Sequence, residues 1–167
     1  MRCPTCGFEN LLGSDVCDNC GSDLAGHDTP QRATEFRGEL LGESLDALGI
    51  TAPETIDAGA NANDAIRRMH DKGIDCVLVI EDGRLVGIFT DRDAVVKVAG
   101  RADGGGHPIR DLMTQDPVVL RHDETIAVAI NKMAVGGFRH IPILDDGRPT
   151  GVISARDVFH HLVDALG

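Results

Sequence analysis

The sequence predicts a mixed α+β fold in which two β-α-β-β-α repeats, related by pseudo-two-fold symmetry, follow a small domain built around four cysteines. A shift of 64 residues aligns "EDGRLVGIFTDRD" (81–93) with "DDGRPTGVISARD" (145–157), which indicates an internal duplication. Each copy alternates segments of helical spacing with short apolar runs typical of strands. The first 24 residues hold four of the five cysteines and are too few to bury a core of their own.

These patterns divide the 167 residues into four segments. A Cys- and Gly-rich domain is expected over 1–24 and a polar linker over 25–38. Repeat one is expected over 39–103 and repeat two over 104–167.

The chain is strongly acidic, with 27 Asp and Glu against 16 Lys and Arg and a net charge of −11. Such a charge repels nucleic acid at long range, and the lack of Trp and Tyr removes most stacking platforms for single strands. Nucleic acid is therefore not an expected partner. The acidic, lysine-poor composition suits a high-salt cytoplasm or follows from genomic base composition, and the sequence leaves both explanations open.

No segment reaches the run of about 18 apolar residues that marks a membrane span. The N-terminus, "MRCPTCGF", has no apolar region of the kind found in a signal peptide. A cytoplasmic protein is therefore expected.

Four cysteines form two Cys-x-x-Cys pairs, each followed by glycine: Cys3 with Cys6, and Cys17 with Cys20. Two such turns place four thiolates together and predict a closed, tetrahedral zinc site of structural type, similar to a zinc ribbon. Zinc would supply most of the folding free energy there, on the order of 10 kcal/mol or more. A reducing cytoplasm disfavours disulfides, and the matched pair disfavours a redox dithiol, while iron is a minor alternative. The fifth cysteine, Cys76, is expected in the core.

Each repeat is expected to begin with a short extended segment that starts at a proline. These segments are "PETI" (53–56) in repeat one and "PVVL" (117–120) in repeat two. An amphipathic helix follows over 61–73 and over 123–137, each ending on a glycine suited to a left-handed C-cap.

An apolar hairpin comes next in each repeat. "DCVLVI" and "LVGIF" flank Asp82-Gly83, and "RHIPIL" and "TGVIS" flank Asp146-Gly147. Asp-Gly between two apolar runs predicts a tight two-residue turn. A closing helix is expected over 91–100 and over 155–166.

From about residue 40 onward, the chain resembles a pair of CBS domains, the tandem unit called a Bateman module. The resemblance rests on "VLVIEDGRLVGIFTDRDAV" in repeat one and on "DLMTQDPVVL" and "FRHIPILDDGRPTGVISARDV" in repeat two. It implies a regulatory module without catalysis. The implied ligands are adenosine compounds, chiefly AMP, ADP or ATP, and less often S-adenosylmethionine or a dinucleotide.

The shared Gly-x-x-Thr/Ser-x-x-Asp signature has two interpretations. Thr90 with Asp93, and Ser154 with Asp157, match the capping box that begins a helix. A helix N-terminus also offers free amides to a phosphate, and a carboxylate one turn further can accept bonds from two ribose hydroxyls. The resemblance implies this second role: Thr90 or Ser154 toward phosphate, and Asp93 or Asp157 toward ribose.

Arginines extend the expected site, because their planar fork suits a phosphate. Arg92 and Arg156 lie beside the aspartates, and Arg139 with His140 begins a strand of repeat two. By resemblance, adenine is expected against residues 51–56 and 114–118. The remaining candidate ligand contacts are Gly87 and Gly151, expected to let the backbone approach the ligand, with Thr114, Pro117, Val118, Ile141 and Pro142.

The two sites are expected to be unequal. Repeat one carries Asp75 and Cys76 where repeat two carries Arg139 and His140. An acidic group disfavours a nearby phosphate, so the copy at Ser154 is expected to be the stronger. A basic side chain of one repeat can also reach a ligand held by the other, which leaves the choice open.

The sequence thus predicts a cytoplasmic regulatory protein that binds an adenine nucleotide between its repeats. Nucleotide binding would shift the arrangement of the repeats, and the zinc domain or a protein partner would read the change. Apolar helical faces ("AIRRM" and "AVAINKM") also predict a homodimer. The alternative is a transcription- or RNA-associated adaptor in which the zinc domain contacts nucleic acid and the repeats only dimerise.

Overall fold

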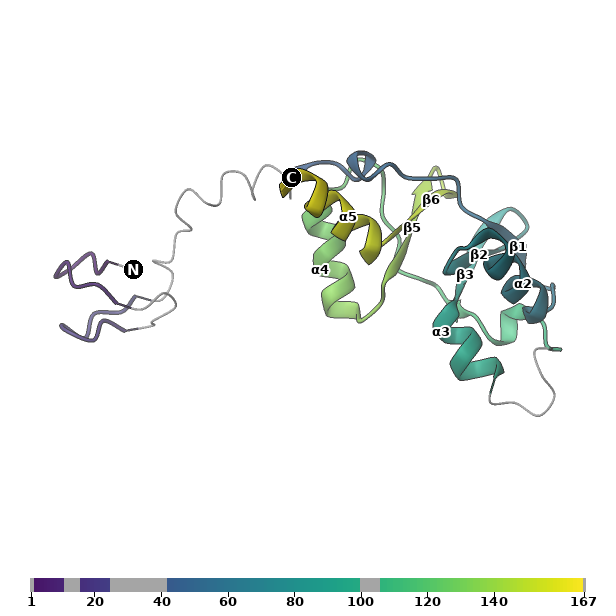
Figure 1. The fold of residues 1–167 in the computed structure, drawn as a ribbon, viewed down its shortest axis with the longest axis horizontal. Coiled ribbons are helices and arrows are strands. Elements are labelled where there is room, and N and C mark those ends of the chain that lie inside the picture. The colour runs from purple at the N-terminus through teal and green to yellow at the C-terminus, as the bar shows by residue number, and fades with distance from the viewer. Residues whose placement is uncertain (1, 11–15, 25–41, 100–105, 167) are drawn as a thin grey trace. The chain divides into compact units, whose positions relative to one another are not determined.

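The structure, a computed structural model, describes residues 2–10, 16–24, 42–99 and 106–166 (Figure 1). The chain divides into two compact units, residues 1–39 and residues 40–167, and each is described by itself. The expected linker at 25–38 and the expected boundary between 103 and 104 lie outside the described residues.

Each Cys-x-x-Cys-Gly segment of the first unit forms a tight turn. The amide of Gly7 donates to the carbonyl of Cys3, and the amide of Gly21 donates to the carbonyl of Cys17, both at 2.9 Å. The two glycines have φ values of 72° and 70°. Because side chains disfavour this left-handed conformation, glycine is the residue suited to follow each cysteine pair.

Repeat one has the predicted order of strand, helix, strand, strand and helix. Its elements are η1 (Leu45–Leu48), β1 (Thr55–Asp57), α2 (Ala62–Lys72), β2 (Cys76–Glu81), β3 (Arg84–Thr90), α3 (Asp91–Asp93) and η2 (Ala94–Val98). Asn61 caps α2 by accepting a bond from the amide of Asn63, and Gly73 ends the helix with a φ of 63°. The predicted closing helix is one α-helical turn, α3, continued by a π-helical turn, η2.

Repeat two has equivalent elements. They are η3 (Ile109–Asp111), β4 (Thr114–Gln115), α4 (Ile126–Gly136), β5 (His140–Asp145), β6 (Arg148–Ser154) and α5 (Ala155–Leu166). Thr125 caps α4, and Gly137 ends it with a φ of 67°. The strand expected in "PVVL" is reduced to a single parallel bridge between Leu120 and Ile143. Figure 1 shows α4 and α5 side by side next to the β5-β6 hairpin.

Both hairpins turn at Asp-Gly, as predicted. β2 pairs antiparallel with β3, and β5 pairs antiparallel with β6. The φ values are 50° and 76° at Asp82 and Gly83, and 46° and 77° at Asp146 and Gly147. A positive φ at both central residues is typical of the type I′ turn, whose twist matches that of the strands.

The two repeats exchange the segments that lead into them. β4, at the start of repeat two, pairs with β3 of repeat one, and Thr114 lies opposite Ile88. The equivalent bridge joins Thr51, at the start of repeat one, to Val152 in β6 of repeat two. β3 and β6 are also in contact with each other. Each capping box therefore lies beside the leading segment of the other repeat.

Gly87 and Gly151 make this exchange sterically possible. A Cβ atom at Gly87 would overlap the Met113 sulfur and lie 2.9 Å from the carbonyl oxygen of Thr114. A Cβ atom at Gly151 would overlap Cγ2 of Ile50. The space beside these glycines is taken by the exchanged segment and is not left open for a ligand, contrary to the expectation from the sequence.

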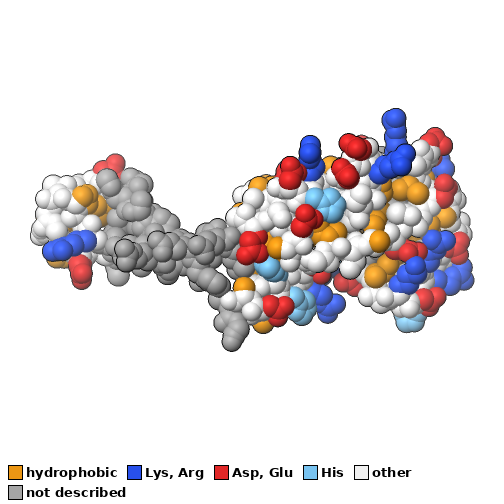
Figure 2. Space-filling model, turned by 90° about the horizontal axis from the view of Figure 1, so that it is seen from above, with side chains coloured by type: hydrophobic (Ala, Val, Ile, Leu, Met, Phe, Trp, Pro, Cys, Tyr) orange, Lys and Arg blue, Asp and Glu red, His pale blue; other side chains and the backbone are white. Residues whose placement is uncertain are grey.

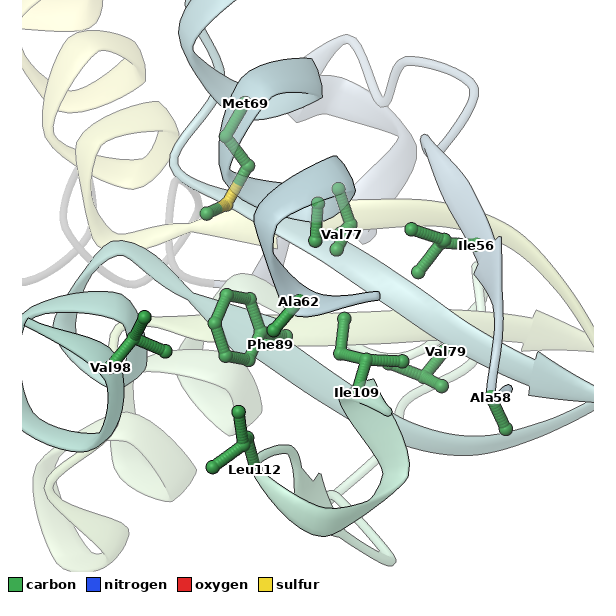
Figure 3. Packing of buried hydrophobic residues seen from close by; sticks show 11 residues of the cluster. Ile56, Ala58, Ala62, Met69, Val77, Val79, Phe89, Val98, Ile109 and Leu112 are labelled. Atoms are coloured by element: carbon green, nitrogen blue, oxygen red, sulfur yellow. The ribbon is translucent and has the colours of Figure 1, made fainter. Parts of the chain in front are cut away.

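Each repeat has its own hydrophobic core. The core of repeat one consists of Ile56, Ala58, Ala62, Ala65, Met69, Val77, Val79, Phe89, Val98, Ile109 and Leu112. Figure 3 shows Phe89 close to Ala62 of α2 and between Val98 and Ile109. The core of repeat two consists of Leu45, Leu120, Ile126, Ala129, Met133, Ile141, Ile143, Ile153 and Val158. Leu45 belongs to the second core because η1 packs on α5 of repeat two.

The apolar faces of α2 and α4 pack inward. Ala65 and Met69 of "AIRRM" lie in the first core, and Ala129 and Met133 of "AVAINKM" lie in the second. The sequence had suggested that these faces form a dimer, but they are not available for one because they lie in the cores. The exposed apolar side chains of the helices are instead Val95, Val96, Val135, Phe159 and Val163.

Acidic and basic side chains are interspersed on the face of the larger unit in Figure 2. None of the helices in the described residues has the length and apolarity required to cross a membrane.

Candidate functional site

Two cavities in the second unit are related by the internal repeat. We call the first the Thr90 cleft; it has a volume of about 470 Å³ and is lined by Ile88, Thr90, Asp91, Arg92, Asp93, Val96, Lys97, Thr114, Asp116, Pro117, Val118, Gly137, Phe138, Arg139 and His140. We call the second the Ser154 cleft; it has a volume of about 460 Å³ and is lined by Thr51, Ala52, Glu54, Lys72, Gly73, Ile74, Asp75, Cys76, His140, Val152, Ser154, Arg156 and Asp157. Most positions of one cleft reappear in the other after a shift of 64 residues.

The Thr90 cleft contains a complete capping box. Oδ2 of Asp93 accepts bonds from the amide of Thr90 at 3.0 Å and from its hydroxyl at 2.8 Å. The amide of Asp93 donates to the Thr90 hydroxyl at 3.3 Å. The Asp93 side chain is buried, and its other oxygen, Oδ1, lies 2.7 Å from Nζ of Lys97. A single carboxylate therefore caps the helix and holds a lysine at the cleft.

The Ser154 cleft contains the same capping box without the lysine. Oδ2 of Asp157 accepts bonds from the amide of Ser154 at 2.7 Å and from its hydroxyl at 2.8 Å. The residue equivalent to Lys97 is His161, which instead bonds to Glu43 at 3.0 Å. Both interpretations of the signature are thus compatible, because each capping box lies in the wall of a cleft.

Arg139 lies at the Thr90 cleft and not at the Ser154 cleft. Its Nη2 atom lies 3.2 Å from Oδ1 and 3.3 Å from Oδ2 of Asp91. The expectation that Arg139 supports the Ser154 copy is therefore wrong. The exchange of leading segments brings the start of β5 opposite the end of β3, so the arginine of repeat two faces the capping box of repeat one.

His140 lines both clefts. Burial lowers the pKa of its imidazole below the usual value, and the positive charge of Arg139 lowers it further. The carboxylates of Asp75, Asp91 and Asp157 raise this pKa but do not outweigh those effects. At neutral pH, His140 is therefore a neutral hydrogen-bonding group between the two clefts.

Asp75 and Cys76 occupy the corresponding positions in the Ser154 cleft. Burial raises the pKa of the Cys76 thiol to about 12, and the nearby carboxylates of Asp75, Asp91 and Asp157 add to this effect. Cys76 is thus a buried neutral thiol, in agreement with the prediction that it belongs to the core.

Most predicted contacts line one of the two clefts. The Thr90 cleft gathers Thr90, Arg92, Asp93, Thr114, Pro117, Val118, Arg139 and His140, and the Ser154 cleft gathers Ser154, Arg156, Asp157 and again His140. Four predicted residues line neither: Gly87, Gly151, Ile141 and Pro142. Ile141 is fully buried in the second core, because side chains alternate along β5 and only His140 at its start reaches the clefts.

Sequence reasoning missed three charged residues of the Thr90 cleft: Asp91, Lys97 and Asp116. Lys97 could have been found, because it follows Asp93 by one helical turn and such pairs lie on one helical face. Asp91 and Asp116 have no signal of this kind, since their position depends on the packing of one repeat against the other.

A larger cavity among the described residues, of about 730 Å³, lies between the two hairpin turns and away from both capping boxes. Its charged lining mixes Asp82, Asp116 and Asp146 with Arg84 and Arg148. None of the four capping-box residues lines it, so we assign the candidate ligand sites to the two smaller clefts.

The first unit brings the four predicted metal ligands together. The sulfur atoms of Cys3, Cys6, Cys17 and Cys20 all lie within 4.8 Å of one another. Cys3 and Cys20 are 3.7 Å apart, and Cys6 and Cys17 are 3.6 Å apart. A tetrahedron with zinc-sulfur bonds of about 2.3 Å has edges of about 3.8 Å, so the four sulfurs fit a zinc ion.

Neighbouring groups favour the thiolate form of Cys17 and Cys20, whereas the pKa of Cys6 is raised to about 11: hydrogen bonds from Phe8 and Asn19 lower it, but burial and the thiols of Cys20 and Cys17 raise it. Burial raises the pKa of the Cys17 thiol, but the backbone amides of Cys20 and Asn19 and the side chain of Asn10 outweigh it and lower that pKa to about 6. Hydrogen bonds from Ser22 lower the pKa of Cys20. Amides directed at the sulfurs stabilise charged ligands of the type that zinc requires.

The sequence model of the CBS domain matches residues 47–100 and 109–164. The chain is 33% identical over 121 residues to the CBS domain-containing protein CBSCBSPB2 of Arabidopsis thaliana, over 71% of this chain and 22% of that protein. It is 34% identical over 126 residues to an uncharacterized 17.7 kDa protein of Acidianus ambivalens, over 74% of this chain and 76% of that protein. The chain spans only 22% to 27% of the length of the Arabidopsis relatives.

Solved structures share the fold of the second unit. The CBS-domain containing protein ATU1752 of Agrobacterium tumefaciens is 31% identical, with a TM-score of 0.65 over 71% of this chain and 98% of that chain. The protein PAE2072 of Pyrobaculum aerophilum, complexed with AMP, is 20% identical, with a TM-score of 0.65 over 74% of this chain and 98% of that chain. The CBS domain pair of MJ0100, in complex with 5-methylthioadenosine and S-adenosylmethionine, is 20% identical, with a TM-score of 0.64 over 72% of this chain and 99% of that chain.

The family match covers both repeats, and the fold, the exchanged segments and the paired capping boxes agree with it. The chain therefore belongs to the CBS domain family, as a tandem CBS pair preceded by a four-cysteine unit.

Proposed function

We propose that this chain is a non-catalytic regulatory protein that senses an adenine nucleotide at the Thr90 cleft. The observation that carries the proposal is the convergence of two repeats on one cavity. The capping box of Thr90 and Asp93 belongs to repeat one, whereas Arg139 and His140 belong to repeat two. The sequence favoured the Ser154 copy but left the choice open, and the position of Arg139 supports the Thr90 cleft.

Each part of a nucleotide has a suitable partner in this cleft. The carboxylate of Asp93 accepts bonds from ribose hydroxyls, and the positive charges of Arg139 and Lys97 attract the phosphate. Ile88, Pro117 and Val118 offer apolar contact to adenine. The AMP complex of PAE2072, which has the same fold, supports this class of ligand.

A ligand in this cleft would couple the two repeats. Asp93 and Arg139 would contact the same molecule from different repeats, so the ligand would favour arrangements in which both are close to it. The four-cysteine unit, or a protein partner bound to it, would read that change. In this proposal the four-cysteine unit binds zinc in a structural role, because four sulfur ligands leave no open position for catalysis.

Calorimetric titration of the full chain with AMP, ADP, ATP and S-adenosylmethionine tests the proposal. We expect one adenine nucleotide to bind, and Arg139→Ala to weaken it by about tenfold or more, because a charge-assisted contact is lost. Arg156→Ala, at the other cleft, is the matched control and is expected to change the affinity by less than about twofold. Failure of all four ligands to bind at millimolar concentration would show that the clefts are structural features only.

We also propose that the protein is a homodimer, formed through the exposed apolar side chains of its helices. Phe159 and Val163 lie one helical turn apart on α5 and are 61% and 48% exposed, and Val135 on α4 is 82% exposed. Exposed large apolar side chains of this kind often mark an interface. Sedimentation analysis is expected to give a dimer, and Phe159→Glu is expected to give a monomer. Arg67→Glu on the charged face of α2 is the control that should leave the dimer intact.

A further inference from the structure

We propose that the Ser154 cleft binds an adenosine compound that carries no phosphate and discriminates against nucleotides. The inference rests on the proposed function, because it assumes that the capping boxes of both clefts hold a ribose. It deepens that function by assigning different ligand classes to the two clefts of one protein.

The Ser154 cleft retains the features that a nucleoside needs. Its volume, about 460 Å³, is nearly that of the Thr90 cleft, about 470 Å³. The capping box of Ser154 and Asp157 is complete, with bonds of 2.7 Å and 2.8 Å to Oδ2 of Asp157. Among the described residues, Oδ1 of Asp157 has no hydrogen-bond partner, whereas Oδ1 of Asp93 is held by Lys97. Asp157 is thus the more available acceptor for ribose hydroxyls.

The Ser154 cleft differs in charge from the Thr90 cleft at three equivalent positions. Where the Thr90 cleft has Arg139, Lys97 and Val118, the matching residues of the other repeat are Asp75, His161 and Glu54. Two of these replacements add a negative charge, and the third takes a lysine out of the lining, because His161 does not line the Ser154 cleft. Arg139 and Asp75 make the largest difference, because they occupy the start of β5 and the segment just before β2 with opposite charges.

Two cations line the Ser154 cleft, Lys72 and Arg156, and Lys72 is paired with Glu54, which Arg68 also contacts from outside the cleft. Nζ of Lys72 lies 2.5 Å from Oε2 of Glu54, and Nη1 of Arg68 lies 3.5 Å from Oε1 of the same carboxylate. These cations lower the pKa of Glu54, through the hydrogen bond from Lys72 above all, so Glu54 is ionised at neutral pH. Arg156 remains, but its equivalent Arg92 is also present in the Thr90 cleft and makes no difference between the two.

At two positions the difference in charge is reversed, because the acidic residue belongs to the Thr90 cleft. Asp91 and Asp116 in the Thr90 cleft correspond to Ala155 and Ala52. Asp91 is paired with Arg139 at 3.2 Å, so its charge is already balanced within the cleft. The charged lining of the Thr90 cleft is then balanced, with three acidic and three basic side chains, while that of the Ser154 cleft has three acidic and two basic ones.

A phosphate dianion in the Ser154 cleft would approach the carboxylate of Asp75 at the position where the Thr90 cleft presents the guanidinium of Arg139. Repulsion between a phosphate and a carboxylate in contact with the same ligand is expected to weaken the affinity for a nucleotide by about tenfold or more. An uncharged or cationic group on the same nucleoside meets no such penalty. The cleft therefore accepts the ribose and adenine and selects against the phosphate.

Adenosine and AMP form the matched pair of probes, because they differ only in the phosphate. Amide NMR of the full chain, followed at the Thr90-Asp93 and Ser154-Asp157 capping boxes, reports each cleft separately. We expect adenosine to shift the Ser154 box, and AMP to require at least about tenfold higher concentration to do so. AMP is expected to shift the Thr90 box first.

Asp75→Arg tests the cause of the selectivity. It is expected to raise the affinity of AMP for the Ser154 cleft by about tenfold and to change that of adenosine by less than about twofold. Asp123→Arg is the control: it makes the same change in net charge at a side chain that is 75% exposed and lies outside both clefts. Asp75→Asn, which only neutralises the charge, provides a milder variant in case the arginine disturbs folding.

The outcomes separate this inference from the proposed function. Equal binding of AMP and adenosine at the Ser154 box, or no adenosine there while AMP binds at the Thr90 box, overturns the inference and leaves the proposed function standing. An Asp75→Arg effect no larger than that of Asp123→Arg also overturns it. Absence of any adenosine compound from both clefts removes the proposed function itself.

Discussion

Arg139 of repeat two lies 3.2 Å from Oδ1 of Asp91 in repeat one, across the Thr90 cleft. This ion pair joins the start of β5 to the helix that follows β3. Its side chains are 62% and 49% exposed, so it is worth no more than about 1 kcal/mol to folding. Its importance lies in where it holds the guanidinium, beside a capping box that belongs to the other repeat.

Asp91→Ala is predicted to increase the affinity for AMP by about threefold to tenfold. The substitution releases Arg139 for the phosphate, because Asp91 is its ion-pair partner. Calorimetry with the single variants and the double variant Asp91→Ala/Arg139→Ala forms a cycle that isolates the effect. The gain should vanish in the Arg139→Ala background, and a gain that persists there would assign the effect to Asp91 alone.

His140 is predicted to make folding sensitive to pH just below 6.5, its usual pKa. Its pKa is lowered in the folded protein, chiefly by burial, so the unfolded chain binds the proton more readily. Stability is then lost as the pH falls through the unfolded value, by no more than about 1.4 kcal/mol per pH unit for one group. Urea unfolding at pH 7.5 and pH 5.5 is expected to show a smaller loss for His140→Gln than for the parent chain. Equal losses in the two proteins would contradict this assignment.

Gly151→Ala is predicted to destabilise the second unit by about 1–3 kcal/mol, the usual cost of overpacking. The new Cβ atom would overlap Ile50 Cγ2, and Ile50 would have to shift together with the bridge between Thr51 and Val152. Thermal unfolding measures the effect. Gly42→Ala is the matched control, because a Cβ there meets no atom within 4 Å. A neutral result for Gly151→Ala would show that the leading segment is free to move.

Removal of zinc is predicted to unfold the first unit and to leave the second intact. A cluster of four cysteines is the main source of order in a unit whose described core contains only Cys3, Cys17 and Leu24. Metal analysis should find one zinc per chain, lost on Cys17→Ser. Amide NMR should then show loss of dispersion for residues 2–24 only. Cys76→Ala is the control and should retain the zinc; loss of zinc from this variant would contradict a site formed by the four N-terminal cysteines.

The sequence alone determined the elements and their order. Helix ends at Gly73 and Gly137, turns at Asp82-Gly83 and Asp146-Gly147, and the capping boxes at Thr90 and Ser154 are local features, and all were confirmed. Local features can be read from a sequence because they depend on the backbone preferences and side-chain bonds of residues only a few positions apart.

Only the tertiary structure decided which residues share a cleft. The pairing of β4 with β3, and of Thr51 with Val152, carries the basic residues of one repeat to the capping box of the other. The duplication made Arg139 appear to belong with Ser154, because the two share a repeat. Contacts between repeats depend on how the sheets and helices of both pack together, and residues 48 positions apart, such as Asp91 and Arg139, leave no periodic pattern that predicts their pairing.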